Sequence, residues 1–170
     1  MAVRRRRRIV VPPHLEGIRA MSSSSRHVVC PACLAINRVP SSKPADQAKC
    51  GKCHQALFTG KPVAADAAAF ERHIAKNDIP VLVDFWAPWC GPCLAMAPAY
   101  ERAAAELEPD FRLLKVNTEE LPELAQRFQI RGIPLLMLFA GGRPVAQQAG
   151  AMDTTRIVQW ARAHATETTA

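Results

Sequence analysis

The sequence predicts an α/β domain preceded by a small cysteine-rich module, and three observations support this. From Asp66 to the C-terminus, apolar runs typical of strands alternate with helical patterns, which indicates a sheet with a parallel core. The length of 170 residues leaves room for one ordinary domain and a small additional unit. All six cysteines fall in three C-x-x-C pairs, a spacing typical of metal sites and redox centres. The sequence therefore predicts two units with different chemistry.

The first elements of the larger domain are a helix, a buried strand and a second helix. Asp66 is expected to cap a helix over about 67–76, because its carboxylate can accept from the free N–H groups of the first turn. The run PVLVDFWA, which starts at Pro80, is apolar and β-branched, as in a strand buried on both faces. An alanine-rich helix is expected over about 91–108, with a kink at Pro98.

The rest of the domain continues the alternation and ends with a hairpin and a helix. The pattern predicts, in order, a strand over 111–116, a helix over 119–128, a strand over 135–139, a turn at Gly141-Gly142, a strand over 144–148 and an amphipathic helix over 154–164. Strands joined by helices pair in parallel, whereas the hairpin adds an antiparallel edge. A mixed central sheet flanked by helices follows.

The positive charge lies in the first third of the chain. The net charge is +7, but the last 109 residues sum to −3. We expect residues 1–26 to be a basic, disordered tail. The alternative is a mis-assigned start codon, in which case the true chain begins at Met21. Residues 27–60 have too few apolar residues for an independent core and are expected to form the cysteine-rich module. Residues 61–65 are expected to be a linker and residues 66–170 the larger domain.

The chain lacks the apolar segments of membrane and exported proteins. No run of about 18 apolar residues occurs, so no membrane-spanning helix is predicted. After the arginines, the apolar run Ile9–Val11 ends at Pro12-Pro13, which is too short for the core of a signal peptide.

The pair in Cys90-Gly91-Pro92-Cys93 follows a buried strand and opens a helix. Free N–H groups and the positive end of the helix dipole stabilise a thiolate at that position. Cys90 is therefore expected to be the nucleophile, and Cys93 to attack the mixed disulfide that forms there. Trp86 and Trp89 flank the pair.

The motifs VDFWAPWCGPC, KVNTEE and GIPLLMLF and the Gly-Gly hairpin together resemble the thioredoxin family from about Asp66 to the C-terminus. The resemblance implies the thioredoxin fold, preceded here by a zinc-ribbon-like module. It also implies that Cys90 attacks and Cys93 resolves, that Asp84 accepts the proton of the resolving thiol, and that Lys115 pairs with Asp84.

The resemblance further implies a groove that holds an extended segment of substrate. Pro134 is marked as a cis-proline that faces the redox pair, and the residue after it, often Thr in the family, is Leu135 here. We expect this leucine to make the docking surface less polar. The expected substrate-binding residues are Trp89, Gly91, Pro92, Ile133, Pro134 and Gly150.

The other two C-x-x-C pairs predict a metal site. Cys30/Cys33 and Cys50/Cys53 are separated by sixteen residues, within the spacing of two loops that close on one tetrahedral Zn²⁺. A segment so poor in apolar residues needs a metal or crosslinks to fold. The four cysteines are therefore the expected ligands of one zinc ion, and no organic cofactor is expected.

The competing interpretation of these four cysteines is a pair of structural disulfides, which a reducing cytosol disfavours. His27 and His54 lie beside the two pairs. Since four sulfurs complete the ligand shell, both histidines are expected to be solvated bystanders.

A zinc ribbon followed by a thioredoxin body resembles the second type of bacterial thioredoxin, and the likeness covers residues 27–170. It implies a monomeric, cytoplasmic, stress-associated bacterial reductase of disulfide-containing client proteins. Thioredoxin reductase with NADPH would supply its electrons, and neither a membrane nor nucleic acid is expected as a partner. Oxidation of the zinc thiolates is expected to eject the metal and to alter activity.

Two other functions remain open from the residues. The ribbon and Arg4–Arg8 could bind nucleic acid, since an arginine run attracts phosphate, but Phe58 is the ribbon's only aromatic for base stacking. The protein could also be a redox-gated holdase, in which metal loss exposes apolar surface.

Overall fold

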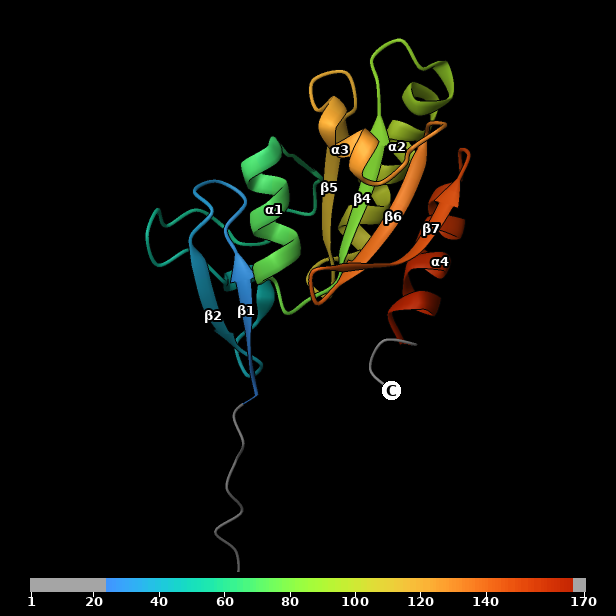
Figure 1. The fold of residues 1–170 in the computed structure, drawn as a ribbon. Coiled ribbons are helices and arrows are strands. Elements are labelled where there is room, and N and C mark those ends of the chain that lie inside the picture. Colours follow the sequence, from blue (N-terminus) through green and yellow to red (C-terminus); the bar gives the residue numbers. More distant parts are fainter. Residues whose placement is uncertain (1–23, 167–170) are drawn as a thin grey trace, which may run out of the picture.

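The structure is a computed structural model that describes residues 24–166, so most of the expected basic tail, including the arginine run, lies outside the described residues. A small unit of residues 24–60, which we call the ribbon, packs beside a larger domain of residues 61–166 (Figure 1). Within this range no helix is long and apolar enough to cross a membrane.

The larger domain is built on a five-stranded mixed sheet in the order β3-β5-β4-β6-β7. The strands β3, β5 and β4 are parallel, while β6 is antiparallel to β4 and β7 to β6. This agrees with the expected parallel core and antiparallel edge. The bounds are Val63–Ala64 for β3, Val81–Trp86 for β4, Arg112–Asn117 for β5, Leu135–Ala140 for β6 and Arg143–Ala149 for β7.

Two boundaries differ from the expectation. Residues 61–65, expected to be a linker, contain β3, in which Val63 pairs with Leu114 of β5. Such a two-residue strand leaves no periodic pattern in the sequence. Residues 25 and 26, expected in the tail, belong to the first strand of the ribbon.

Helices cover both faces of the sheet. They are α1 (Ala67–Lys76), α2 (Gly91–Leu107), α3 (Pro122–Arg127) and α4 (Thr154–Thr166). The core under α2 and α4 includes Leu82, and the core under α1 and α3 includes Val81 and Val83. Successive residues of β4 thus point to opposite faces, so the strand is buried on both sides as predicted.

Local interactions set the ends of these helices. The carboxylate of Asp66 accepts from the N–H of Ala69 at 2.8 Å, which confirms the predicted cap of α1. Helix α3 begins later than expected because the chain first turns, with the N–H of Leu121 bonded to the carbonyl of Asn117 at 3.0 Å. Helix α2 continues through Pro98.

The edge hairpin turns at Gly141 and Gly142, which have φ values of 57° and 78°. These left-handed conformations explain why glycines occupy the turn. The register between β6 and β7 shifts between Leu138 and Phe139, and Phe139 pairs with Pro144.

The ribbon consists of two antiparallel strands, β1 (Ser25–Val29) and β2 (Ile36–Pro40), a short 3₁₀ helix η1 (Ala45–Gln47) and the loops that carry four cysteines. Its own core is small, as expected, and is made of Val28, Cys30, Val39, Ala48, Cys50 and Leu57. The ribbon also makes hydrogen bonds to the larger domain.

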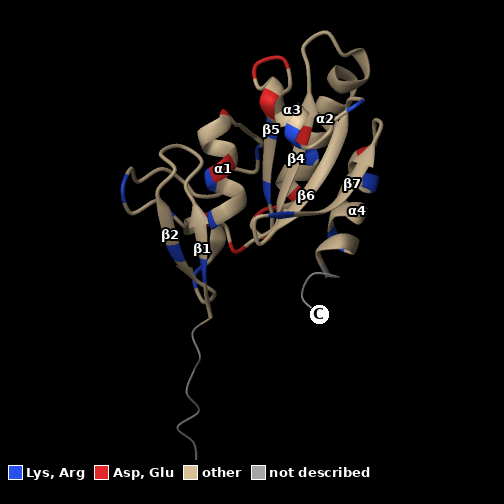
Figure 2. Cartoon of the chain, in the orientation of Figure 1, with Lys and Arg blue, Asp and Glu red and all other residues tan. Residues whose placement is uncertain are grey.

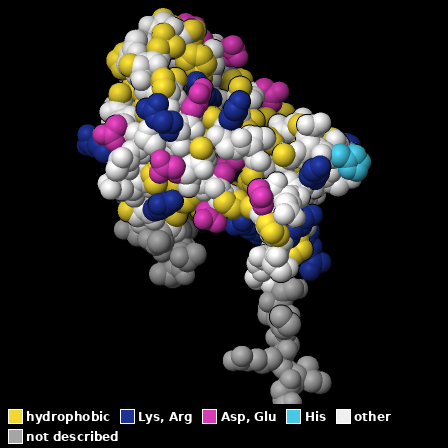
Figure 3. All heavy atoms as spheres, turned by 180° about the vertical axis from the view of Figure 1, so that it is seen from behind, with side chains coloured by type: hydrophobic (Ala, Val, Ile, Leu, Met, Phe, Trp, Pro, Cys, Tyr) yellow, Lys and Arg dark blue, Asp and Glu magenta, His cyan; other side chains and the backbone are white. Residues whose placement is uncertain are grey.

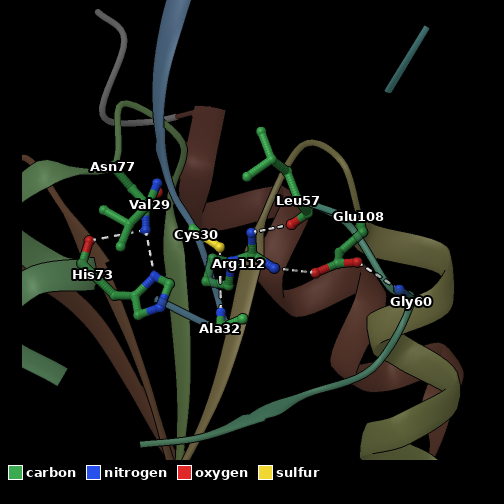
Figure 4. Close-up of polar contacts among 9 residues, drawn as sticks. All are labelled: Val29, Cys30, Ala32, Leu57, Gly60, His73, Asn77, Glu108 and Arg112. Carbon is green, nitrogen blue, oxygen red and sulfur yellow. Dashed lines mark hydrogen bonds and ion pairs between the residues drawn. The ribbon is translucent and has the colours of Figure 1, made fainter. Parts of the chain in front are cut away.

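A buried ion pair lies in that interface. The guanidinium of Arg112, the first residue of β5, donates to the carboxylate of Glu108 and to the carbonyl of Leu57, each at 2.6 Å (Figure 4). The other oxygen of Glu108 accepts from the N–H of Gly60 at 2.6 Å. The Arg112 side chain is fully buried. One residue of the central sheet therefore holds the backbone at the end of the ribbon.

The end of α1 supplies further contacts to the ribbon. The N–H of Val29 donates to the side-chain oxygen of Asn77 at 2.8 Å, and the Asn77 amide donates to Nδ1 of His73 at 3.0 Å (Figure 4). His73 is fully buried, and burial together with the charge of Arg112 lowers its pKa to about 3. The imidazole is therefore neutral at pH 7.

Candidate redox and metal sites

Cys90 and Cys93 form a disulfide with an S–S distance of 2.18 Å. They lie where β4 ends and α2 begins, and Cys90 is the N-cap of α2. The backbone N–H of Cys93 donates to Sγ of Cys90 at 3.2 Å. Such a donor and the positive end of the helix dipole stabilise a thiolate on Cys90 once the disulfide is reduced. The structure thus brings the expected redox pair together in the expected setting.

The surface beside this pair exposes large apolar side chains, and the adjoining pocket of Trp89 and Ile133 also carries Glu119 and Arg131. Trp89 is 68% exposed and Leu94 is 52% exposed. From the start of α2 at Gly91, no Asp, Glu, Lys or Arg occurs before Glu101. Hydrophobic side chains gather at this end of the molecule, above the loop between β4 and α2 (Figure 3). Leu94 was not among the expected site residues, although its helical spacing from Cys90 could have indicated it.

The expected substrate-binding residues lie around the same pair. The Ile133–Pro134 peptide bond is cis, and the carbonyl oxygen of Ile133 is 3.8 Å from Sγ of Cys90. The N–H of Gly150, a residue with φ of 94°, donates to the carbonyl of Pro134 at 3.0 Å. Gly91 and Pro92 are exposed at the start of α2.

Leu135 does not enlarge the apolar docking surface, so that expectation is wrong. The residue is the first of β6, where successive side chains point to opposite faces. Its side chain is 7% exposed and belongs to the core under α1 and α3.

Asp84 and Lys115 are paired in register on β4 and β5. Asp84 is only 1% exposed, and neither carboxylate oxygen has a hydrogen-bond partner among residues 24–166. Burial raises the pKa of Asp84 to about 7, against the opposing effect of the Lys115 charge. A carboxyl group in this condition exchanges its proton near neutral pH. Nζ of Lys115 lies 4.6 Å from the centre of the Trp86 ring.

The four remaining cysteines converge at the tips of the ribbon loops. Their sulfur atoms all lie within 4.8 Å of one another, and Cys30–Cys53 and Cys33–Cys50 are 3.6 Å apart. Four sulfurs at 2.3 Å from a tetrahedral Zn²⁺ would be separated by about 3.8 Å, so the donors fit this ion. None of the four is in a disulfide.

Backbone N–H groups point at two of these sulfurs, as expected around metal thiolates. The N–H of Ala32 donates to Cys30, and the N–H of Lys52 donates to Cys50, each at 3.4 Å. The side-chain amide of Asn37 also donates to Cys50, at 3.6 Å. These donors orient the ligands and disperse their charge.

The two neighbouring histidines are outside the sulfur cluster. His54 is exposed, as expected. Nδ1 of His27 lies 3.0 Å from the carboxylate of Asp78, and the N–H of His27 donates to the same oxygen. His27 therefore contributes to the interface and is not a mere bystander.

The interface residues Arg112 and Glu108 were not anticipated from the sequence. Arg112 starts β5 and stands four positions after Glu108. That spacing is typical of an ion pair. It does not reveal that the partner surface is the ribbon.

Comparison with known proteins matches both parts of the chain. The thioredoxin profile matches residues 61–163, and the profile described as Thioredoxin 2, N-terminal, a zinc ribbon, matches residues 29–55. The chain is similar to Thioredoxin C-3 of Corynebacterium nephridii, with 41% identity over 133 residues, 78% of this chain and 91% of that protein.

Other relatives cover mainly the larger domain. The chain is 43% identical to Thioredoxin 1 of Nostoc sp. PCC 7120 over 97 residues, 57% of this chain and 91% of that protein. A mutant thioredoxin from Halobacterium salinarum NRC-1 has a similar solved structure, with a TM-score of 0.57 and 29% identity, covering 64% of this chain and 94% of that one.

Proposed function

The chain belongs to the thioredoxin family and is a thiol-disulfide oxidoreductase that reduces protein disulfides, and we propose that Cys90 and Cys93 carry out the exchange. The observation that supports this most directly is their disulfide at the N-terminus of α2. The cis-proline Pro134 lies on the loop between α3 and β6, and the carbonyl oxygen of Ile133 approaches Cys90.

In the first step, the thiolate of Cys90 attacks one sulfur of a client disulfide. A mixed disulfide forms, and the other client sulfur leaves as a thiolate and takes a proton from water. The Cys93 thiol then gives its proton to the Asp84 carboxylate and attacks Sγ of Cys90. This releases the second client sulfur and leaves the Cys90–Cys93 disulfide, so two electrons pass to the client.

Asp84 suits the role of proton acceptor because of its environment. Its pKa near 7 lets it take up and release a proton at neutral pH. Lys115, adjacent on β5, stabilises the ionised form and so adjusts this balance. We assign both residues as positioning and proton-handling partners of Cys93.

We assign substrate binding to the backbone at Ile133, Pro134 and Gly150, and to the exposed surface of Trp89, Gly91 and Pro92. An extended client segment can pair with the backbone of Ile133, the residue before the cis-proline, whereas the Pro134 carbonyl already accepts from the N–H of Gly150. Thioredoxins act on disulfide-containing client proteins and receive electrons from thioredoxin reductase. We propose NADPH as the ultimate donor for this chain.

We further propose that Cys30, Cys33, Cys50 and Cys53 hold one Zn²⁺. When bound, this ion crosslinks the two ribbon loops, which the small ribbon core needs in order to fold. We propose that the ribbon ends at residue 60 and that the larger domain begins before Asp66, with β3 as its first strand. Thiols that are not in disulfides suit a reducing compartment, so we place the protein in the bacterial cytoplasm. We also propose that it is a monomer.

A nucleic-acid-binding role is not favoured. Phe58, the one aromatic of the ribbon, lies under the guanidinium groups of Arg112 and Arg26, at 5.3 and 5.9 Å from its centre. Its ring is therefore occupied by contacts within the protein.

The test is Cys90→Ser in the full chain, assayed by reduction of insulin with dithiothreitol as the electron donor. We expect no turnover above the background rate of dithiothreitol, with an unchanged far-ultraviolet circular dichroism spectrum. Retained turnover by this variant would overturn the assignment of Cys90. Reduction by Cys93→Ser at the wild-type rate would overturn that of Cys93.

A further inference from the structure

A groove of about 680 Å³ opens between the ribbon and the larger domain. Its ribbon wall is the loop between the first two cysteines, with Pro31, Ala32 and Leu34. The facing wall includes Trp86 and Lys115. We call this the ribbon groove. It is distinct from the surface beside Trp89 and the cis-proline, and it exists only because the ribbon is docked.

The ribbon wall is fixed in place. The carbonyl of Leu34 accepts from Nε of Arg72 at 3.2 Å, and the Leu34 side chain packs on the core under α1. The interface in Figure 4 holds the rest of the ribbon through Arg112 and Asn77. The groove is therefore a preformed feature, and a ligand need not order it on binding.

The ribbon groove and the redox site share one side chain, that of Trp86. Trp86 packs against the cluster of Ala87, Cys90 and Cys93 and also lines the groove. Pro88, two residues before Cys90, lines it as well. A client chain whose disulfide is held at Cys90 thus has this groove beside it.

The chemistry of the groove indicates what part of a client it fits. Its lining combines small apolar side chains with polar groups. These are the amide of Asn117, the ammonium of Lys115, and the carboxylates of Glu120 and of Asp66, which also caps α1. That ammonium lies over the Trp86 ring. The loop after β5 is red in Figure 2 because it holds Glu119 and Glu120, of which Glu120 lines the groove. The excess of carboxylates complements a positive charge.

We propose that the ribbon groove binds the client polypeptide next to its disulfide and favours segments with a lysine or arginine among small apolar residues. This rests on the proposed role of Cys90. The ribbon then contributes to client selection as well as to a metal site. The energy of one such charge contact at a partly exposed position corresponds to a rate ratio of about twofold to fivefold.

The test uses Ala32, whose side chain is exposed at the ribbon wall. Only its backbone N–H contacts a cysteine, so substitution leaves that contact in place. The probes are two disulfide-linked peptides that differ only in lysine or glutamate near the cysteine. We measure kcat/KM for each peptide, with Ala32→Glu and Ala32→Lys in the full zinc-loaded chain.

We expect the wild type to prefer the lysine peptide. Ala32→Glu should raise the lysine-to-glutamate ratio by about twofold to fivefold, and Ala32→Lys should lower it by a similar factor. Opposite changes from two substitutions at one position cannot arise from general loss of structure. Higher salt should reduce both effects, because the contacts are screened.

Lys52→Glu is the matched control. Lys52 holds the equivalent position in the second C-x-x-C loop, donates its N–H to Cys50 and does not line the groove. We expect it to leave the ratio unchanged. The proposal would be overturned if the lysine-to-glutamate ratio of kcat/KM did not change with the charge at position 32. It would also be overturned if Lys52→Glu changed that ratio as much as Ala32→Glu does.

A small aromatic disulfide that cannot reach the groove separates this proposal from the one on which it rests. All variants should reduce it at the wild-type rate. If even the wild type fails to reduce it, the proposed role of Cys90 is at fault.

Discussion

Replacing Arg112 by Met tests how the ribbon is held on the sheet. Methionine fills a similar volume but carries no charge and no donor. The substitution leaves the Glu108 carboxylate bonded only to the backbone N–H groups of Thr59 and Gly60, and it leaves the carbonyl of Leu57 without its donor. Both groups belong to a part of the interface where Arg112 is fully buried and Glu108 nearly so.

The expected loss is large because one partner of a buried pair is removed. Breaking such a pair costs about 3–5 kcal/mol in the free energy of unfolding, since the remaining charge stays buried. Adding Glu108→Leu removes that charge and should recover part of the loss. Recovery in the double variant would identify the stranded carboxylate as the main cause.

Arg26→Met is a matched control on the other side of the same aromatic ring. Arg26 also lies over Phe58, but its ion pair with Asp110 is 3.5 Å long and solvent-exposed. We expect it to cost less than about 1 kcal/mol. The measurement is urea denaturation of the zinc-loaded protein at pH 7, monitored by circular dichroism. Urea is uncharged, so it does not screen the ion pairs.

Equal losses for Arg112→Met and Arg26→Met would refute this reasoning. The Arg112 guanidinium would then be hydrated, and the ribbon would be held by apolar contacts alone. A full loss in the double variant would likewise refute the role given to the stranded Glu108 charge.

Three further predictions follow from the two sites. Asp84→Asn should stabilise the protein by roughly 4 kcal/mol at pH 8. The reason is that the pKa of Asp84 is 3.8 in the unfolded chain and about 7 in the folded one, so the wild type loses stability as the pH rises between these values. Urea denaturation from pH 3 to 8 checks this, and a stability gain that persists below pH 4 would contradict it. Cys93→Ser should trap clients as mixed disulfides on Cys90, visible by mass spectrometry of the intact protein, whereas free client would argue against a resolving role. Removal of zinc by a chelator should increase amide hydrogen exchange in the ribbon and at Asp78, whose N–H donates to the carbonyl of His27 at 2.9 Å, while protection at Asp78 equal to that of the zinc-loaded protein would show that the two parts unfold independently.

Most of the larger domain could be predicted from the sequence because its elements carry strong local signals. The β4 run is long, apolar and β-branched, Asp66 is a good cap, and Gly141-Gly142 supplies the positive φ of a tight turn. The cysteine spacings likewise predicted a redox pair at the start of a helix and a cluster of four sulfurs, and the structure has both.

What could not be predicted depends on contacts between distant segments. Strand β3 has two residues and exists only because β5 offers it an edge. Arg112 looks like a surface residue until the ribbon covers it, and His27 gains Asp78 from 51 positions away. Leu135 begins a strand as predicted, but the burial of its side chain depends on the packing of α1 and α3 against that face of the sheet. Periodicity carries no information about such partners.

The two edges of the five-stranded sheet affect how the protein behaves at high concentration. An uncovered strand edge presents unpaired amides and can recruit a strand from another molecule, the first step toward fibres. At one edge, β3 is only two residues long. At the other, β7 begins with Arg143 and Pro144, the proline lacks an N–H, and the register shift opposite it distorts the strand. The proposed client site holds extended segments, but the two sheet edges offer few places for a further strand to pair. We therefore expect the protein to resist self-association at high concentration.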